Sequence, residues 1–181
     1  MNDIYHEQPN ELEQVRDWYL NIYKSLESYK KEIYSNLGSR NSNISFEFLG
    51  LTEKELEKKF QEYFKELSFT ICLNYAASIE ASIQTDFKFR VINKKKDIIS
   101  RKLRDLANKE NTLKISLTEI LLVWKENFPE LKKIINQYED ILKFRHWLAH
   151  GRHWVLKVKI YEENLVYSQG KELLSRMSSI I

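Results

Sequence analysis

Three of the four histidines and two of the four tryptophans of this 181-residue sequence lie within residues 146–154. Arg145 and Arg152 lie beside these histidines, and Gly151 directly follows His150. Histidine can give and take a proton near neutral pH, and arginine is a permanent, forked donor that suits phosphate groups. The run is therefore a candidate site for phosphate chemistry at the end of a helix.

The histidines of this run also allow two other interpretations. At a helix C-terminus, His150 can interact with the helix dipole, which is worth about 0.3–1 kcal/mol. His146 and His150 are four residues apart, a spacing that also suits zinc, with His153 or a carboxylate as a third ligand. We expect no metal, because the sequence has no H-E-x-x-H pattern and Cys72 is its one cysteine.

A second feature is the charge of residues 88–104, which hold eight basic side chains against Asp97 alone. The basic residues are Lys88, Arg90, Lys94, Lys95, Lys96, Arg101, Lys102 and Arg104. A segment of this charge can hold a nucleic-acid backbone, although charge runs in general are more often solvated helix faces.

Composition limits the fold class. Hydrophobic residues make up 43% of the chain and charged residues 30%, enough to bury a core. With 4 glycines and 2 prolines, the chain lacks the tight turns that β-sandwiches and barrels need. One cysteine excludes a disulfide scaffold. No apolar run approaches the length of a membrane span and no signal peptide is evident, so we expect a cytoplasmic protein without a membrane partner.

The elements that must position these residues begin with an amphipathic helix over residues 11–37, whose apolar residues fall at steps of three and four. Asn10 and Glu13 predict a capping box at its start, and Gly38 predicts its end. The loop that follows has an apolar centre that we expect to fold onto the core, made of Phe46, Phe48 and Leu49.

A second, long helix is predicted from Thr52 to about Asn93. Thr52 and Glu55 form a capping-box pattern, and no helix breaker interrupts the residues that follow. The stretch from Cys72 to Ile83 is almost wholly apolar or small, and a helix without a polar face is central in its bundle.

Three shorter helices are expected next. The first covers residues 94–108 and carries much of the basic segment. Its predicted inward-facing residues are Ile98, Ile99, Leu103 and Leu106. The second covers residues 117–127 and starts at Ser116, and the third begins with Pro129 and ends at Gly151.

Beyond Gly151 the apolar period changes. Residues 155–160 alternate between apolar and lysine side chains, which predicts a small β-hairpin before a short final helix at 170–181. We find no repeat and no linker, so the sequence predicts one domain: an all-α, up-down bundle of five to six helices. Its core covers residues 52–154, with residues 155–181 as a C-terminal tail.

The histidine-rich run resembles the HEPN family (higher eukaryotes and prokaryotes nucleotide-binding domain). Arg145, four further residues and His150 match the family motif Arg-x(4–6)-His, and His146 stands where the family usually has Asn, Asp or His. The His-Gly ending is also common there. The segment LNYAASIEASIQTDF places Glu80 in a small, apolar helix, similar to the acidic position on a central helix of many HEPN ribonucleases. The resemblance covers roughly residues 52–154.

This resemblance implies a metal-independent endoribonuclease that needs no cofactor and works as a homodimer with its motif helices face to face. In the family chemistry, a 2′-OH attacks the adjacent phosphate and leaves a 2′,3′-cyclic phosphate and a 5′-OH. Arg145 and His150 would be catalytic, with His146 and Glu80 in support. Many such domains are toxins or antiviral-defence nucleases, so an antitoxin or regulatory protein is an expected partner.

Helical geometry adds a condition to this mechanism. Five positions separate Arg145 and His150 by about 140° around a helix axis. One helix therefore cannot aim both at one phosphate, unless a second copy contributes or the helix frays at Gly151. In such a site, His150 would act as general acid or base and Arg145 would stabilise charge in the transition state.

Structural roles compete with these assignments. Arg145 can form an ion pair, with Glu139, Asp140 or Glu80 as partner. A pair with Glu80 would satisfy both interpretations, and a buried Glu80 needs some partner because an unpaired buried charge is costly. Trp147 and Trp154 are more often core or interface residues than platforms for base stacking.

Two classes of function follow. In the ribonuclease, RNA would be held by Arg152, His153, Lys94, Lys95, Lys96, Arg101, Lys102 and Arg104. The alternative is a non-catalytic helical module that binds RNA, a nucleotide or a protein, or that simply oligomerises through its long helices. A basic segment remote from the motif would favour this alternative.

Overall fold

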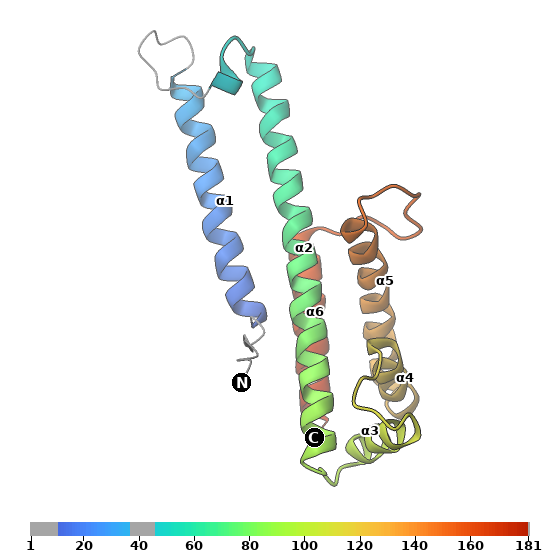
Figure 1. The fold of residues 1–181 in the computed structure, drawn as a ribbon. Helices are drawn as coiled ribbons and strands as arrows, with labels where there is room; N and C mark the ends of the chain where they lie inside the picture. Colours follow the sequence, from blue (N-terminus) through green and yellow to red (C-terminus); the bar gives the residue numbers. More distant parts are fainter. Residues whose placement is uncertain (1–10, 37–45, 181) are drawn as a thin grey trace, which may run out of the picture.

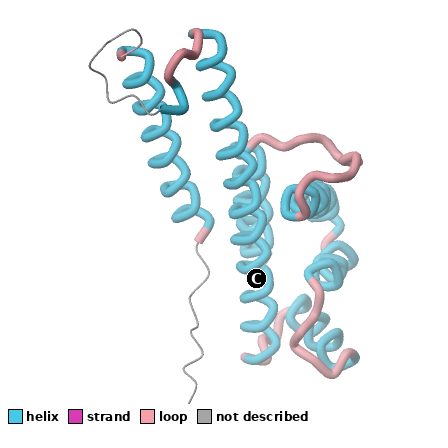
Figure 2. Tube along the Cα trace, turned by 45° about the horizontal axis from the view of Figure 1, so that its top comes forward, coloured by secondary structure: helices cyan, strands magenta, loops and turns pink. Residues whose placement is uncertain are grey.

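The computed structural model describes residues 11–36 and 46–180, and every regular element in these ranges is helical (Figures 1 and 2). The α-helices are α1 (Leu12–Ser35), α2 (Glu53–Ile92), α3 (Ile98–Lys109), α4 (Leu117–Asn127), α5 (Lys132–Ala149) and α6 (Glu163–Ser179). Single 3₁₀ turns, η1 (Phe46–Phe48) and η2 (Pro129–Leu131), precede α2 and α5. The predicted all-α class is confirmed.

Helix α2 is the centre of the arrangement, since it contacts each of the other five α-helices. Its N-terminus is the predicted capping box: the Thr52 hydroxyl accepts from the backbone N–H of Glu55 at 3.3 Å, and the Glu55 carboxylate accepts from the N–H of Thr52 at 2.9 Å. The helix continues without a break to Asn93, as predicted. Its second half carries the core residues Tyr75, Ala76, Ile79, Ile83 and Phe87.

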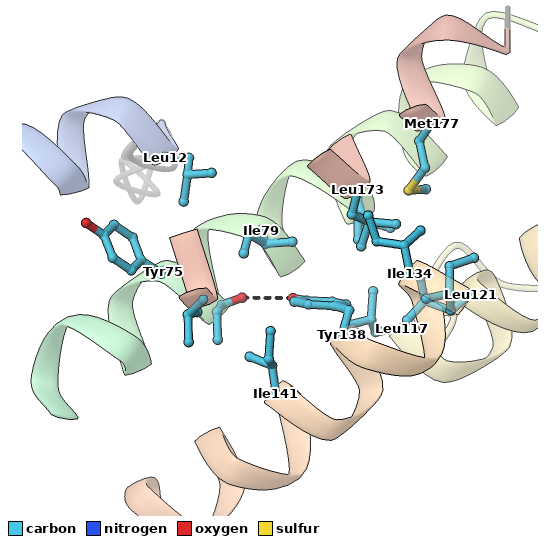
Figure 3. Close-up of a cluster of buried hydrophobic side chains, with 14 of the residues drawn as sticks. Leu12, Tyr75, Ile79, Leu117, Leu121, Ile134, Tyr138, Ile141, Leu173 and Met177 are labelled. Carbon is cyan, nitrogen blue, oxygen red and sulfur yellow. Dashed lines mark hydrogen bonds between the residues drawn. The ribbon is translucent and has the colours of Figure 1, made fainter. Parts of the chain in front are cut away.

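The main core takes buried side chains from all six α-helices, and Figure 3 shows its part between α2, α4, α5 and α6 together with Leu12 of α1. At its centre the Tyr138 hydroxyl of α5 donates to the carbonyl oxygen of Ala76 on α2 at 3.1 Å, which satisfies a phenol that is fully buried. A smaller cluster joins α1 to the first part of α2, made of Ile33, Phe48, Leu56 and Phe60. In Figure 1 this pair of helices extends beyond the other four.

Most helix boundaries agree with the sequence. Helix α4 begins at its predicted Ser116 cap, and α5 ends one residue before His150. Helix α1 starts at a Glu11 cap, whose N–H donates to Gln14 at 3.0 Å, and the predicted Asn10 cap and Gly38 stop lie outside the described residues.

Two predicted core residues are exposed instead. Leu49 is 56% exposed, whereas Phe48 is buried as expected; the side chain of Phe46 lies outside the described set. Ile98 is 67% exposed because the buried face of α3 follows Ile99, Leu103 and Ala107, at steps of four residues. The helix begins at an Asp97 cap rather than near residue 94. The Asp97 side chain accepts from the N–H of Ser100 at 2.9 Å, and Ile99 and Leu103 are the buried residues.

The predicted β-hairpin is wrong. Residues 155–160 form an irregular segment, and the expected return strand belongs to α6. The buried residues of α6 recur at helical spacing, and they are Val166, Gly170, Leu173 and Met177. The absence of a side chain at Gly170 allows this close packing, since a Cβ there would lie 2.1 Å from Cδ1 of Ile79 and would force that side chain to move.

None of the helices described in residues 11–36 and 46–180 combines the length and apolarity needed to cross a bilayer.

Candidate functional site

The site begins with the way α5 ends. Gly151 has a φ of +78°, a conformation that glycine adopts without strain. It lets the N–H of Gly151 donate to Leu148 at 3.4 Å and the N–H of Arg152 donate to Trp147 at 3.1 Å, which is the Schellman pattern of helix termination. His150 is the C-cap residue, so its side chain leaves the helix at the point where the chain turns away.

Three aromatic rings gather at this end. The ring centroids of His146 and His150 lie 4.2 Å apart, and that of Trp154 lies 5.5 Å from the first and 6.2 Å from the second. All three side chains are exposed. Nδ1 of His153 lies 2.8 Å from the carbonyl oxygen of His150 and is engaged with the backbone. The arrangement thus offers two neighbouring imidazoles to solvent.

Arg152 fixes the segment that follows α5. Its guanidinium forms a two-pronged ion pair with Glu66 on α2, with N–O distances of 2.7 and 2.9 Å, and lies over the Phe69 ring at 5.3 Å. This hydrogen-bonded guanidinium holds the pKa of Glu66 below its ordinary value. Arg152 was predicted to bind RNA; in the free chain its donors are directed to Glu66.

A groove of about 780 Å³ opens beside His146, between α4, α5 and the irregular segment. It is lined by Thr118, Glu139, Leu142, Lys143, His146, Trp154, Leu156, Lys157 and Val158. The Lys143 ammonium pairs with Asp140 at 2.7 Å, and Lys157 forms no ion pair with any described residue. A second hollow of about 570 Å³ between α1 and α2 has no charged residue in its lining. Of these two hollows, the groove beside His146 is therefore the one that combines cationic and apolar side chains.

Arg145 and Glu80 lie near the opposite side of α5, next to the buried Tyr138. Burial raises the pKa of the Tyr138 phenol far above its ordinary value, the Glu80 carboxylate raises it further, and the Arg145 guanidinium lowers it. Both charged residues are half-buried. Neither forms an ion pair with a described residue, so the expected Glu80–Arg145 pair is not formed, and partial exposure leaves each charge within reach of water.

The other suggested partners of Arg145 are also occupied elsewhere. Glu139 pairs with Lys125 at 2.7 Å, and Asp140 pairs with Lys143. Within one chain, no contact joins Arg145 to His150 in the described residues. For zinc, the described part of the chain has no group of three His, Cys, Asp or Glu side chains placed to hold an ion.

The basic segment lies at the other end of the bundle. Arg90 is buried and bound to Asp86 and Asp97, whereas the lysines at 88, 94, 95, 96 and 102 and Arg101 are exposed. The α2 positions that touch the two regions, Glu66 and Arg90, are about 36 Å apart along the helix at 1.5 Å per residue. Figure 1 places the α2–α3 turn at the bottom and the end of α5 well above it.

The sequence placed Trp154 in the candidate run without giving Trp154 or Lys143 a role in binding, and it did not connect Lys157 with the site. Trp154 was weighed mainly as a core residue, but it is Trp147 that packs inward, against Phe144, and donates its Nε1–H to the Trp154 carbonyl at 2.8 Å. Lys157 was taken as part of a strand. The signal that could have connected these residues with the site is Gly151. It ends α5 and reverses the chain, so that the residues after it run back alongside the last turns of the helix.

Comparison of the chain with models of protein families, with curated proteins and with solved structures gave no match. The HEPN resemblance therefore rests on the sequence motif and stays a prediction.

Proposed function

We propose that this chain is a metal-independent endoribonuclease of the toxin or antiviral-defence type. The observation that carries the proposal is the exposed His146–His150 pair at the end of α5, 4.2 Å between ring centroids, beside a groove with Trp154, Lys143 and Lys157. Imidazoles transfer protons, lysines attract phosphates, and an exposed indole can stack on a base. The Arg-x4-His spacing of Arg145 and His150 resembles the HEPN motif, and this resemblance suggests the type of reaction.

In the proposed reaction, His150 removes the proton of a ribose 2′-OH, and O2′ attacks the adjacent phosphorus. The P–O2′ bond forms as the P–O5′ bond breaks, and the 5′-oxygen leaves with a proton from a second acid, for which His146 is the nearest imidazole. The products are a 2′,3′-cyclic phosphate and a 5′-OH. Arg145 supplies positive charge to the phosphorane-like transition state.

A second copy of the chain completes this site. Arg145 and His150 lie on different sides of α5, so we propose that Arg145 of one copy faces the phosphate held by His150 of the other. A homodimer built on α5 places both sets in one cleft. An antitoxin or regulatory protein that covers this face is the proposed means of control.

The test is cleavage of total and transfer RNA in EDTA. We expect His150→Ala and Arg145→Ala each to lower the rate by about 10²–10³-fold, the usual effect of removing an acid–base group or a charge-stabilising donor. His6→Ala and Arg176→Ala are the matched controls and should cleave at the wild-type rate. Products that end in a 2′,3′-cyclic phosphate support the mechanism. A wild-type chain as silent as its variants on all RNA pools would contradict it.

Mixing the two inactive variants tests the composite site directly. In a mixed dimer of His150→Ala and Arg145→Ala chains, one of the two sites receives an intact arginine and an intact histidine. Since half of the dimers are mixed, we expect recovery of about a quarter of the wild-type rate. No recovery after exchange of subunits would place both residues in one chain's own site.

A non-catalytic binding module is the second candidate function. It is favoured by the position of the exposed basic residues, about 36 Å from the motif along α2. RNA binding that survives in the His150→Ala variant, with no cleavage by the wild type, would select it.

A further inference from the structure

The turn between α2 and α3 exposes apolar and basic side chains together. Phe89, Ile92 and Ile98 are 52%, 63% and 67% exposed. Together with the exposed cations around them we call this surface the tip; the cations are Lys88, Lys94, Lys95, Lys96, Arg101 and Lys102. Large apolar side chains gathered at one exposed place indicate an interaction surface.

The tip is held in a fixed shape by a buried arginine. Arg90 donates from Nε to Asp86 at 2.6 Å and from Nη1 to Asp97 and to the Ser100 hydroxyl, both at 3.3 Å. These bonds tie the end of α2 to the start of α3. The surface is thus preorganised, and it does not need to fold when it binds.

The charge of the tip is not neutralised within the described chain. Its six cations form no ion pair with a described residue, because Asp86 and Asp97 are bound to Arg90. Asp105 is an exposed acid further along α3, and it forms no ion pair with them. Lys95 lies over the Phe89 ring at 5.1 Å, so cation and apolar surface are in contact. A ligand of the tip must therefore be anionic and must also cover apolar groups.

We propose that the tip docks on an anionic membrane surface. The six cations would meet lipid headgroups, and Phe89, Ile92 and Ile98 would enter the boundary between headgroups and acyl chains, as in other interfacial sites. A single-stranded nucleic acid fits less well, because bases stack on aromatic faces and two of the three apolar residues are isoleucines. The proposed contact is peripheral, and it departs from the expectation of no membrane partner, which rested on the lack of a spanning segment and of a signal peptide; none of the described helices could cross a bilayer.

This inference does not depend on ribonuclease activity, and its test keeps the two apart. Full-length chain would be floated with vesicles of phosphatidylcholine alone or mixed with phosphatidylglycerol. Two variants remove one component each: Ile92→Ser/Ile98→Ser and Lys96→Glu/Lys102→Glu. The matched control, Leu49→Ser/Lys58→Glu, changes one exposed leucine and one exposed lysine at the far end of α2. Circular dichroism checks that each variant is folded.

We expect binding to the anionic vesicles only, weakened by 0.5 M salt. Each tip variant should lose at least about tenfold in partitioning, since burial of isoleucine and each headgroup charge contribute separately. The far-end variant and His150→Ala should bind like wild type. Equal binding to neutral vesicles, or wild-type binding by the isoleucine variant, would overturn the proposal. A third outcome would also overturn it: the chain binds RNA but no vesicles, and this RNA binding needs Lys96 and Lys102 but not the two isoleucines.

Discussion

The two cationic ends of the bundle differ in what their cations touch. Near the end of α5, two of the cations are paired within the chain, Arg152 with Glu66 and Lys143 with Asp140, whereas Arg145 and Lys157 form no ion pair with a described residue. At the α2–α3 tip, six exposed cations have no such partner among the described residues. Paired cations position the chain, whereas unpaired cations beside apolar groups are free to meet an external anion.

Within the basic segment, residues 88–104, buried and exposed cations also differ in what they contact. Arg90 belongs to residues 88–104 by sequence, yet it is 3% exposed and holds the turn together. Lys88, two positions earlier on α2, is exposed. Net charge along a sequence therefore overstates the charge that a surface presents.

Replacement of Arg90 by methionine is the largest effect we predict for stability. Methionine fills part of the space but removes the guanidinium that Asp86 and Asp97 pair with. Loss of one partner of a buried ion pair costs about 3–5 kcal/mol. Because Asp86 and Asp97 stay partly exposed, we expect the lower end, about 3 kcal/mol, in urea unfolding followed by circular dichroism. The matched variant Lys88→Met should change stability by less than about 0.5 kcal/mol. Equal midpoints for the two variants would show that Arg90 does not hold the tip.

The two tryptophans of the motif end provide a smaller contrast. Trp147 is half-buried against Phe144 and Phe69, so Trp147→Ala should lower the free energy of unfolding by about 2 kcal/mol, less than a full core truncation. Trp154→Ala should cost less than about 1 kcal/mol, because its ring faces the groove. On RNA substrates the order should reverse, with Trp154→Ala raising KM severalfold. If Trp154→Ala is the more destabilising variant, its ring belongs to the core rather than to a binding surface.

Local signals predicted most of the fold. The capping boxes at Thr52 and Ser116 and the glycine stop at Gly151 depend on contacts within a few residues, and each is found at its predicted position. Adjacent apolar residues are harder: Ile98 and Ile99 both fit a helix, and the packing of α3 against α2 and α4 decides that Ile99 is the buried one. The pattern Asp97-x-x-Ser100 was a readable signal for the start of α3.

The motif's angular separation was also predictable, but its surroundings were not. In the described chain, Arg145 and His150 form no contact with each other, in agreement with the separation that the helical period requires. The groove depends on where residues 153–158 run, and this path is fixed by the Glu66–Arg152 pair across 86 positions of sequence. No local pattern contains such a contact. Alternation of apolar and lysine side chains in that segment predicted a strand because nothing nearby excluded one.

The smallest effect we predict concerns this pair, and it tests whether Arg152 holds the segment that forms the groove. Arg152 lowers the pKa of Glu66, so the pair stabilises the fold above the ordinary pKa of glutamate. That contribution is lost as the pH falls through the lowered pKa. Glu66 is 55% exposed, so the pair is worth less than about 1 kcal/mol. Its effect is best read locally, by hydrogen exchange.

At pH 7, Glu66→Gln should reduce the protection of amides in residues 153–160 by a few fold, and the control Glu62→Gln, an exposed residue of the same helix, should not. As the pH falls through the lowered pKa of Glu66, wild type and Glu66→Gln should converge, because the wild-type carboxylate becomes protonated and can no longer pair as an anion. Identical protection at pH 7 would assign the path of the segment to the Trp147–Trp154 hydrogen bond instead. In that case Arg152 would be free to bind phosphate, and the contrast between paired and unpaired cations would hold for Lys143 alone.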